Sequence, residues 1–223
     1  MKRFLAVFAP AMMMMSLAAI VAFPAQAAKV GRASQAFANA RPDKEETAWG
    51  RLAADAIKAA ARSDVALLNA GALNKGTLES GAVEDSEVAA LLAFPDDDVV
   101  TLSLSGAQLR AALEYAVKDA PTASSRWLQS AGLTATYDAS RPSGNRITDL
   151  RVKGREVGDG DAFSVAMPMG LAQGGAGFYT VWDEAKSKTA KSAGVSLSGA
   201  VANYFGARDE LAPDAKARLK KAR

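Results

Sequence analysis

The residues with the clearest chemical potential lie in one glycine-rich turn, QGGAGF, at positions 173–178. Three glycines in four positions followed by an aromatic ring are typical of a turn that cradles a phosphate or presents a ring to a flat ligand. Neither phosphate-binding template fits, because a Walker loop requires Lys with Ser or Thr after its last glycine, and a dinucleotide loop requires a glycine where Thr180 stands. We therefore attribute Gly174, Gly175 and Gly177 to backbone angles or close approaches. Two interpretations of Phe178 stay open: a stacking surface for a base, or a ring folded back into the core.

The absence of histidine and cysteine excludes most hydrolytic chemistry. The sequence contains none of either residue, so it cannot build a Ser-His-Asp triad, a Cys-His pair or a metal site with imidazole ligands. Carboxylate-only metal binding and Ser-Lys chemistry remain. The densest acidic group, Asp96 to Asp98, lacks the glycine of a calcium loop, because the sixth position from Asp96 is Thr101. We interpret this group as a solvated loop between a helix and a strand.

The first residues have the pattern of an export signal. Lys2 and Arg3 precede a segment without charge from Phe4 to Phe23, and an Ala-x-Ala motif ends at Ala27. This pattern predicts a signal peptide over residues 1–27, cleaved after Ala27. An uncleaved membrane anchor is the alternative. Cleavage would leave no stable membrane anchor and would place the protein in the periplasm or outside the cell.

Residues 28–223 suit one compact domain. Without Lys2 and Arg3, the 27 basic residues become 25, against 24 acidic ones, so the net charge says little about partners. We predict no nucleic-acid partner. The local excess of positive charge is KARLKKAR at positions 216–223. We expect a solvated, frayed end there rather than a contact with anionic lipid or nucleic acid.

Apolar periodicity predicts an α+β fold with helices flanking a mostly antiparallel sheet. Ser105 and Gln108 have the spacing of a capping box ahead of a helix. Trp49 and Trp127 are expected in the core. The expected helices begin near Thr47, span 86–92, follow Ser105 and span 198–205, and the expected strands are 64–68, 99–104, 133–137, 147–152 and 163–167.

Five segments resemble one known family. WLQSAGLTATYDASRPSGNRITDLRVKGREV (127–157) resembles the C-terminal domain of bacterial and animal 5′-nucleotidases. The other segments, in chain order, are TAWGRLAADAI (47–57), DVALLNAGAL (64–73), VVTLSLSGAQLRAAL (99–113) and MGLAQGGAGF (169–178). The resemblance implies a single compact domain with mixed sheet layers over 45–206. The small, polar residues before it predict an N-terminal arm over 28–44, and the charge after it predicts a basic tail over 207–223.

The resemblance also implies a set of ligand-binding residues. It places Phe178 where the family has a stacking ring, and Asn69 and Gly71 in a loop that approaches the ligand. Asn74 stands where the family has an arginine, and Asp183 is a candidate ribose-binding carboxylate. The second ring of the family corresponds to Pro95, with Phe94 adjacent, and the aspartate of its glycine turn corresponds to Ala176. Candidate substrate-binding residues are therefore Phe178, Asn69, Gly71, Asn74, Gly174, Gly175, Gly177 and Asp183.

In full-length relatives, this domain grips a nucleoside and brings its phosphate to two metal ions held by a separate metallophosphoesterase domain. The resemblance therefore implies an exported module of nucleotide catabolism or salvage that binds a nucleotide or nucleoside and lacks the dimetal hydrolytic half. We expect no catalytic residue and no cofactor in this chain, and a dimetal site would come from a separately encoded metallophosphoesterase. A degenerate domain acting as a cell-envelope interaction or scaffold protein is the alternative. An autonomous phosphohydrolase ranks last.

Overall fold

The computed structural model describes residues 27–222. Its elements, in chain order, are β1 (Lys29–Ala33), β2 (Phe37–Asn39), α1 (Ala48–Ala61), β3 (Val65–Asn69), η1 (Ala70–Ala72), β4 (Gly76–Leu78), β5 (Gly81–Glu84), α2 (Asp85–Ala90), β6 (Asp98–Ser105), α3 (Gly106–Ala116), β7 (Leu128–Ala131), β8 (Leu133–Tyr137), β9 (Ile147–Val152), β10 (Arg155–Glu156), β11 (Ala162–Pro168), α4 (Met169–Ala172), η2 (Gly175–Thr180), α5 (Glu184–Ser187), β12 (Lys191–Ser196), α6 (Leu197–Gly206) and β13 (Leu219–Lys221). The α+β class expected from the sequence is confirmed.

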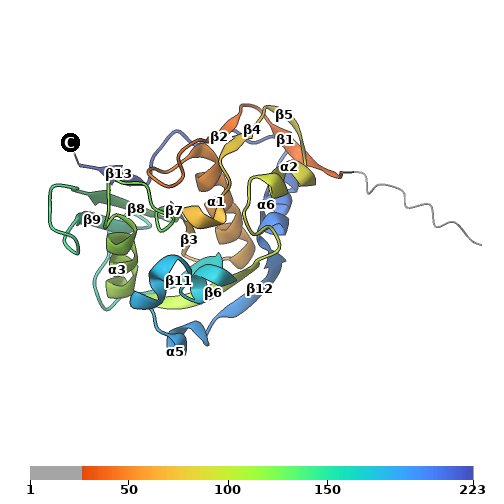
Figure 1. The fold of residues 1–223 in the computed structure, drawn as a ribbon. Helices are drawn as coiled ribbons and strands as arrows, with labels where there is room; N and C mark the ends of the chain where they lie inside the picture. The colour runs from red at the N-terminus through yellow and green to blue at the C-terminus, as the bar shows by residue number, and fades with distance from the viewer. Residues whose placement is uncertain (1–26, 223) are drawn as a thin grey trace, which may run out of the picture.

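A five-stranded sheet of order β12-β6-β11-β3-β7 forms the centre of the molecule (Figure 1). β11 pairs with β3 in parallel, and the remaining three pairings are antiparallel. Both faces are covered, since Val65 and Leu67 of β3 belong to one apolar cluster and Ala66 and Leu68 to another. Such burial on both sides explains why this strand is a continuous apolar run in the sequence.

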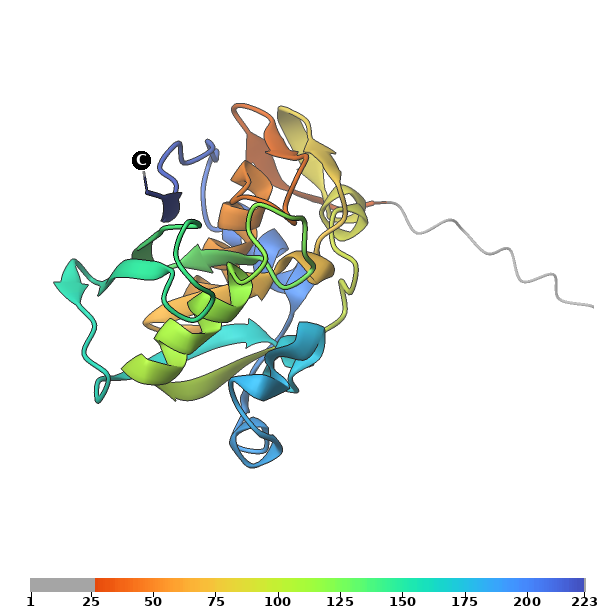
Figure 2. The ribbon, with the colours of Figure 1, turned by 60° about the vertical axis from the view of Figure 1, so that its left-hand side comes forward.

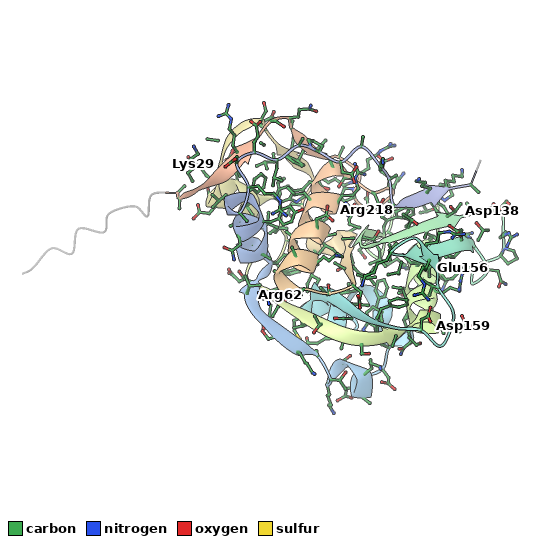
Figure 3. The ribbon with its side chains drawn as sticks, turned by 180° about the vertical axis from the view of Figure 1, so that it is seen from behind. Lys29, Arg62, Asp138, Glu156, Asp159 and Arg218 are labelled. Atoms are coloured by element: carbon green, nitrogen blue, oxygen red, sulfur yellow. The ribbon has the colours of Figure 1, made fainter. Side chains whose placement is uncertain are left out.

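Two groups of helices cover the two faces of this sheet. α1 and α6 lie side by side over one face (Figure 3). α3 crosses the other face (Figure 2), where Leu109 and Leu113 are completely buried. A second, four-stranded sheet of order β10-β9-β8-β13 adds its apolar face to the cluster under α3.

Local signals in the sequence fix the beginnings of α1 and α3. Thr47 Oγ1 accepts a hydrogen bond from the Gly50 amide at 3.0 Å. At α3, the Gln108 amide donates to Ser105 Oγ at 3.1 Å, and the Ser105 amide donates to Gln108 Oε1 at 3.0 Å. The capping box is therefore confirmed. Trp49 and Trp127 are buried, as expected.

The predicted N-terminal arm over 28–44 is wrong. β1 pairs antiparallel with β5, and β2 pairs antiparallel with β4. Ala33 and Phe37 are each 1% exposed, so this segment contributes to the core of the domain. Strands of five and three residues carry too little periodicity to stand out, and their partners lie far along the chain.

The prediction of a frayed, solvated C-terminal end is also wrong. β13 pairs in parallel with β8, and Leu219 is 4% exposed. Arg218, labelled in Figure 3, keeps only 13% of its side chain exposed and forms an ion pair with Asp55 at 2.7 Å. The basic residues of this segment thus include one cation that holds the chain end against α1.

The predicted signal peptide lies outside the described residues except for Ala27. Within residues 27–222, no helix is long and apolar enough to cross a membrane.

Candidate functional site

The predicted site residues gather at one edge of the five-stranded sheet. β3 and β11 run parallel, so their carboxyl ends, at Asn69 and Pro168, point to the same edge. β6 runs antiparallel to β11, with Val99 opposite Pro168. The loop at 93–97, which precedes β6, therefore reaches this edge too, together with η1, α4 and η2.

Asn69 and Gly71 fix the loop in front of β7. Asn69 is 9% exposed, and its Nδ2 donates to the Ser125 carbonyl at 3.3 Å. The Gly71 amide donates to the same carbonyl at 3.0 Å. A Cβ on Gly71 would lie 3.0 Å from Asn69 Nδ2, so the glycine permits this close packing. In this structure, Asn69 and Gly71 thus both donate hydrogen bonds to a carbonyl of the protein itself.

Asn74 fastens its own loop to the end of α2. Its Nδ2 donates to the carbonyls of Ala90 and Leu92 at 3.0 and 3.1 Å. Both amide hydrogens are therefore engaged within the protein. Where the resemblance places an arginine, this chain has a side chain that closes a loop.

The three glycines of the turn meet the backbone requirement expected from the sequence. Gly174 and Gly177 have φ angles of +89° and +88°, which favour glycine. A Cβ on Gly175 would lie 2.5 Å from the Gly170 carbonyl oxygen, and one on Gly177 would lie 2.1 Å from Tyr115 Oη. Left-handed backbone angles and close approaches of neighbouring atoms thus explain why these three positions are glycine. The helix η2 begins within the turn, at Gly175.

Phe178 lies inside the core. It is completely buried; Trp182 stacks on its ring at 5.1 Å between centroids, and Tyr115 meets it edge-on at 5.1 Å. The interpretation of Phe178 as an accessible stacking surface is corrected, and the alternative of a ring folded back into the core holds.

The neighbouring ring takes the exposed position instead. Tyr179 is 70% exposed and Phe94 is 61% exposed, the two large apolar side chains that stand out on the surface of the described residues. Tyr179 lines a cavity of about 460 Å³, together with Met169, Gln173, Trp182, Ser187 and Lys188. Sequence reasoning missed Tyr179 because the winding of η2 decides which of two adjacent rings points outward.

Polar groups of several kinds surround this cavity. Lys188 forms an exposed ion pair with Glu184 at 2.8 Å, and Ser187 Oγ donates to the Ala172 carbonyl at 2.7 Å. The Gln173 side chain makes no hydrogen bond with any described residue, and Trp182 Nε1 is buried without a partner among them. The exposed Gln173 amide thus offers free hydrogen-bonding capacity beside the exposed Tyr179 ring, whereas Trp182 Nε1 is covered by protein atoms.

Asp183 begins α5 rather than lining the cavity. Its Oδ1 accepts a hydrogen bond from the Lys186 amide at 2.8 Å, which is the contact of an N-cap residue. Asp97, from the acidic run, accepts a hydrogen bond from the Gly170 amide at 3.0 Å and so ties the 93–97 loop to α4. Within residues 27–222, no group of three or more acidic residues is arranged to hold a metal ion.

Comparison with known proteins identifies the family. The model of the family described as "5′-nucleotidase, C-terminal domain" matches residues 27–184. A 5′-nucleotidase-related protein of Glossina morsitans morsitans is 35% identical over 140 residues, which cover 58% of this chain and 25% of the relative.

Two solved structures are similar in fold. The 5′-nucleotidase precursor of Thermus thermophilus has a TM-score of 0.79 at 23% identity, over 86% of this chain and 39% of its own. The NAD nucleotidase of Haemophilus influenzae has a TM-score of 0.74 at 14% identity, over 88% of this chain and 38% of its own. The chain thus spans a quarter of the curated relative and about two fifths of each solved structure. From the family match over residues 27–184, we conclude that this chain belongs to the 5′-nucleotidase C-terminal domain family.

Proposed function

We propose that this protein binds a nucleoside or nucleotide at the cavity beside Tyr179. The observation that carries the proposal is the exposed Tyr179 ring, which follows the glycine turn and borders a cavity of about 460 Å³. This volume falls within the range of about 300–1,000 Å³ that is usual for small-molecule sites. Stacking of a base on an aromatic ring contributes roughly 1–3 kcal/mol.

Neighbouring side chains supply the contacts that such a ligand needs. The free amide of Gln173 suits the polar edge of a base, and the ammonium group of Lys188 suits a phosphate once it exchanges its exposed partner Glu184. Phe94, in the loop that Asp97 ties to α4, is our candidate for a second apolar contact. In this proposal Tyr179 takes the role that the resemblance gave to Phe178.

The proposal separates binding from hydrolysis. Because the sequence has no histidine, we propose that a dimetal centre comes from a separately encoded metallophosphoesterase, and that the pair acts in nucleotide catabolism or salvage. A periplasmic or secreted location, set by the predicted signal peptide, belongs to the same proposal.

The direct test is ligand binding by the Tyr179→Ala variant. We expect adenosine or adenosine monophosphate to raise the melting temperature of the wild-type protein, and we expect the variant to bind at least about tenfold more weakly because the stacking surface is lost. Thr180→Ala is the matched control, since Thr180 is exposed on the same turn but does not line the cavity. Equal binding by wild type and Tyr179→Ala would contradict the proposed site.

Two further outcomes separate the other functions. If no nucleoside, nucleotide or nucleotide sugar shifts the melting temperature at millimolar concentration, the scaffold function gains over the binding function. Sustained phosphate release from a nucleoside monophosphate by the pure protein with manganese would contradict the division of labour between two chains. Affinity capture from a periplasmic extract tests the metallophosphoesterase partner.

A further inference from the structure

We propose that a second site, the α3 groove, binds a small organic anion carrying a phosphate or carboxylate group. The groove is a cavity of about 470 Å³ between α3, the turn at Ser143 and Gly144, and the end of η2. Arg110 brings positive charge to it from α3 and Lys118 from the turn after α3, and Ala107, Ala111 and Val181 supply apolar surface. This site does not depend on the proposed nucleoside site.

Arg110 provides the anchoring charge. Its side chain is only partly exposed, and its guanidinium forms neither an ion pair nor a hydrogen bond with any residue in 27–222. Partial removal of a cation from water is unfavourable unless a partner compensates it. A planar guanidinium matches the two oxygens of a carboxylate or phosphate, so an anion is the partner of suitable chemistry.

The acidic residue one turn further along α3 makes no ion pair with Arg110. Glu114 directs its carboxylate at the protein, where Oε2 accepts from the Arg146 amide at 2.9 Å and Oε1 from the Ile147 amide at 2.7 Å. These two hydrogen bonds also fix the turn that forms the opposite wall of the groove. Both carboxylate oxygens of Glu114 thus accept hydrogen bonds from the wall of the groove.

Asp159 is the remaining acidic group at the groove. It is exposed on the turn after β10, on the side of the molecule where α3 lies (Figure 3). The two cations of the lining, Arg110 and Lys118, balance Glu114 and Asp159 in formal charge, so the anchoring contact is the direct one to the unpaired guanidinium of Arg110. Asp159 should weakly repel an incoming anion from the solvent side. Its removal should therefore strengthen anion binding, whereas removal of Arg110 should weaken it.

The floor of the groove connects it to η2. Tyr115 lines the groove, donates its hydroxyl to the Ala176 carbonyl at 3.4 Å and packs edge-on against Phe178. Thr180 and Val181 line the α3 groove, whereas Tyr179 and Trp182 line the cavity of the nucleoside site. One segment of chain thus separates two cavities, and each can be altered without changing the lining of the other.

The test uses calorimetric titration of the full protein with phenyl phosphate and with benzoate, and with benzyl alcohol as the uncharged control. We expect both anions to bind and benzyl alcohol not to bind. Arg110→Gln should weaken binding at least about tenfold, because a charge-assisted contact is lost. Asp159→Asn should strengthen it about twofold by removing an exposed like charge. Arg155→Gln, an exposed arginine on β10 outside the groove, should leave it unchanged.

Weaker anion binding by Arg110→Gln and tighter anion binding by Asp159→Asn, both with unchanged melting temperatures, would support the proposal. General destabilisation of the protein cannot tighten binding. Absence of anion binding at millimolar concentration, or equal binding by wild type and Arg110→Gln, would overturn it. Tyr179→Ala should retain phenyl phosphate binding even if it loses adenosine. This difference keeps a failure of the nucleoside site distinct from a failure of the α3 groove.

Discussion

Ala176 holds left-handed backbone angles, φ 54° and ψ 21°, which are strained for a residue with a Cβ by roughly 1–2 kcal/mol. The strain relieved by Ala176→Gly exceeds the extra entropy of glycine in the unfolded chain, about 0.5–1 kcal/mol. We therefore expect this substitution to raise the free energy of unfolding by about 0.5–1 kcal/mol in urea denaturation.

Ala59→Gly is the control for this prediction. Ala59 is exposed inside α1, so glycine there should lower stability by about 1 kcal/mol. If both substitutions destabilise the protein equally, Ala176 is not strained.

Gly177 shows a different constraint, because both its angles and its neighbour exclude a side chain. A Cβ would lie 2.1 Å from Tyr115 Oη. We expect Gly177→Ala to lower stability by about 3 kcal/mol or more, whereas Gly144→Ala, at a φ of +91° with no atom within 4 Å, should cost only the backbone strain of about 1–2 kcal/mol.

A double-mutant cycle separates the two contributions at Gly177. Tyr115→Phe removes the obstructing hydroxyl, so Gly177→Ala should be less destabilising in that background by about 1 kcal/mol or more. Additive free energies of unfolding would show that the hydroxyl is not the obstacle.

The choice between Phe178 and Tyr179 marks a limit of prediction from sequence at this scale. The sequence predicts the correct cause for the glycines of the turn, because no template for phosphate binding fits them. Which of two adjacent rings enters the core depends on the direction in which η2 leaves Gly174 and on the space between Tyr115 and Trp182. That space is built by α3 and by the chain after η2, and neither neighbour is visible in the hexapeptide.

At the scale of elements, the predictions succeeded where periodicity is long and failed where it is short. α1, β3, β6 and α3 have apolar spacing or burial over five to fourteen residues. β13 has three residues, of which only Leu219 is buried. β13 forms because it pairs with the free edge of β8 and because Arg218 forms an ion pair with Asp55. β8 and Asp55 are both distant from β13 in the sequence, so the short segment alone does not predict a strand.

The C-terminal segment should therefore contribute measurably to stability. Arg218 pairs with Asp55 and donates Nη1 to the Ser130 carbonyl at 2.6 Å, while the Leu219 amide donates to Glu46 Oε2 at 2.9 Å. We expect Arg218→Ala to lower the free energy of unfolding by about 2–4 kcal/mol, because Asp55 and the carbonyl lose a mostly buried partner.

Arg32→Ala is the matched control. Arg32 pairs with Glu210 at 3.1 Å, but the two side chains are 58% and 46% exposed, so its loss should cost less than about 1 kcal/mol. Similar effects of the two substitutions in urea denaturation would mean that the C-terminal segment is not held by Arg218.

At the scale of the whole molecule, the absence of histidine predicts a broad pH plateau. No side chain of this chain has an ordinary pKa between 5 and 8. On the alkaline side, burial raises the pKa of Tyr137 and Tyr204 above their ordinary value. Tyrosines in the unfolded chain ionise first, near pH 10, so stability is retained below that pH and declines as pH rises beyond it.

On the acid side, the paired aspartates set the limit of the plateau. A hydrogen bond from Lys153, followed by one from the Ser164 amide, holds the pKa of Asp64 below its ordinary value of 3.8. The backbone hydrogen bond from Lys216 does the same for the pKa of Asp214. Because these folded-state pKa values are depressed, the stabilisation is fully present above the unfolded value and is lost as pH falls through the folded one. The free energy of unfolding should therefore be nearly constant from about pH 5 to 9 and fall below about pH 4.

Asp64→Asn tests whether this acid limit comes from specific contacts or from general charge. Asp64 joins the two sheets, since it receives Lys153 Nζ at 2.7 Å from the β9–β10 turn and the Ser164 amide at 3.1 Å from β11. The variant should be less stable than wild type at pH 7, and the difference should shrink as pH falls below 3.8 and through the lowered folded-state pKa of Asp64. Asp96→Asn removes an exposed carboxylate without a partner among the described residues, so its stability should follow that of wild type throughout. Parallel pH profiles for wild type and Asp64→Asn would contradict the contact mechanism, because repulsion among many charges changes little when one is removed.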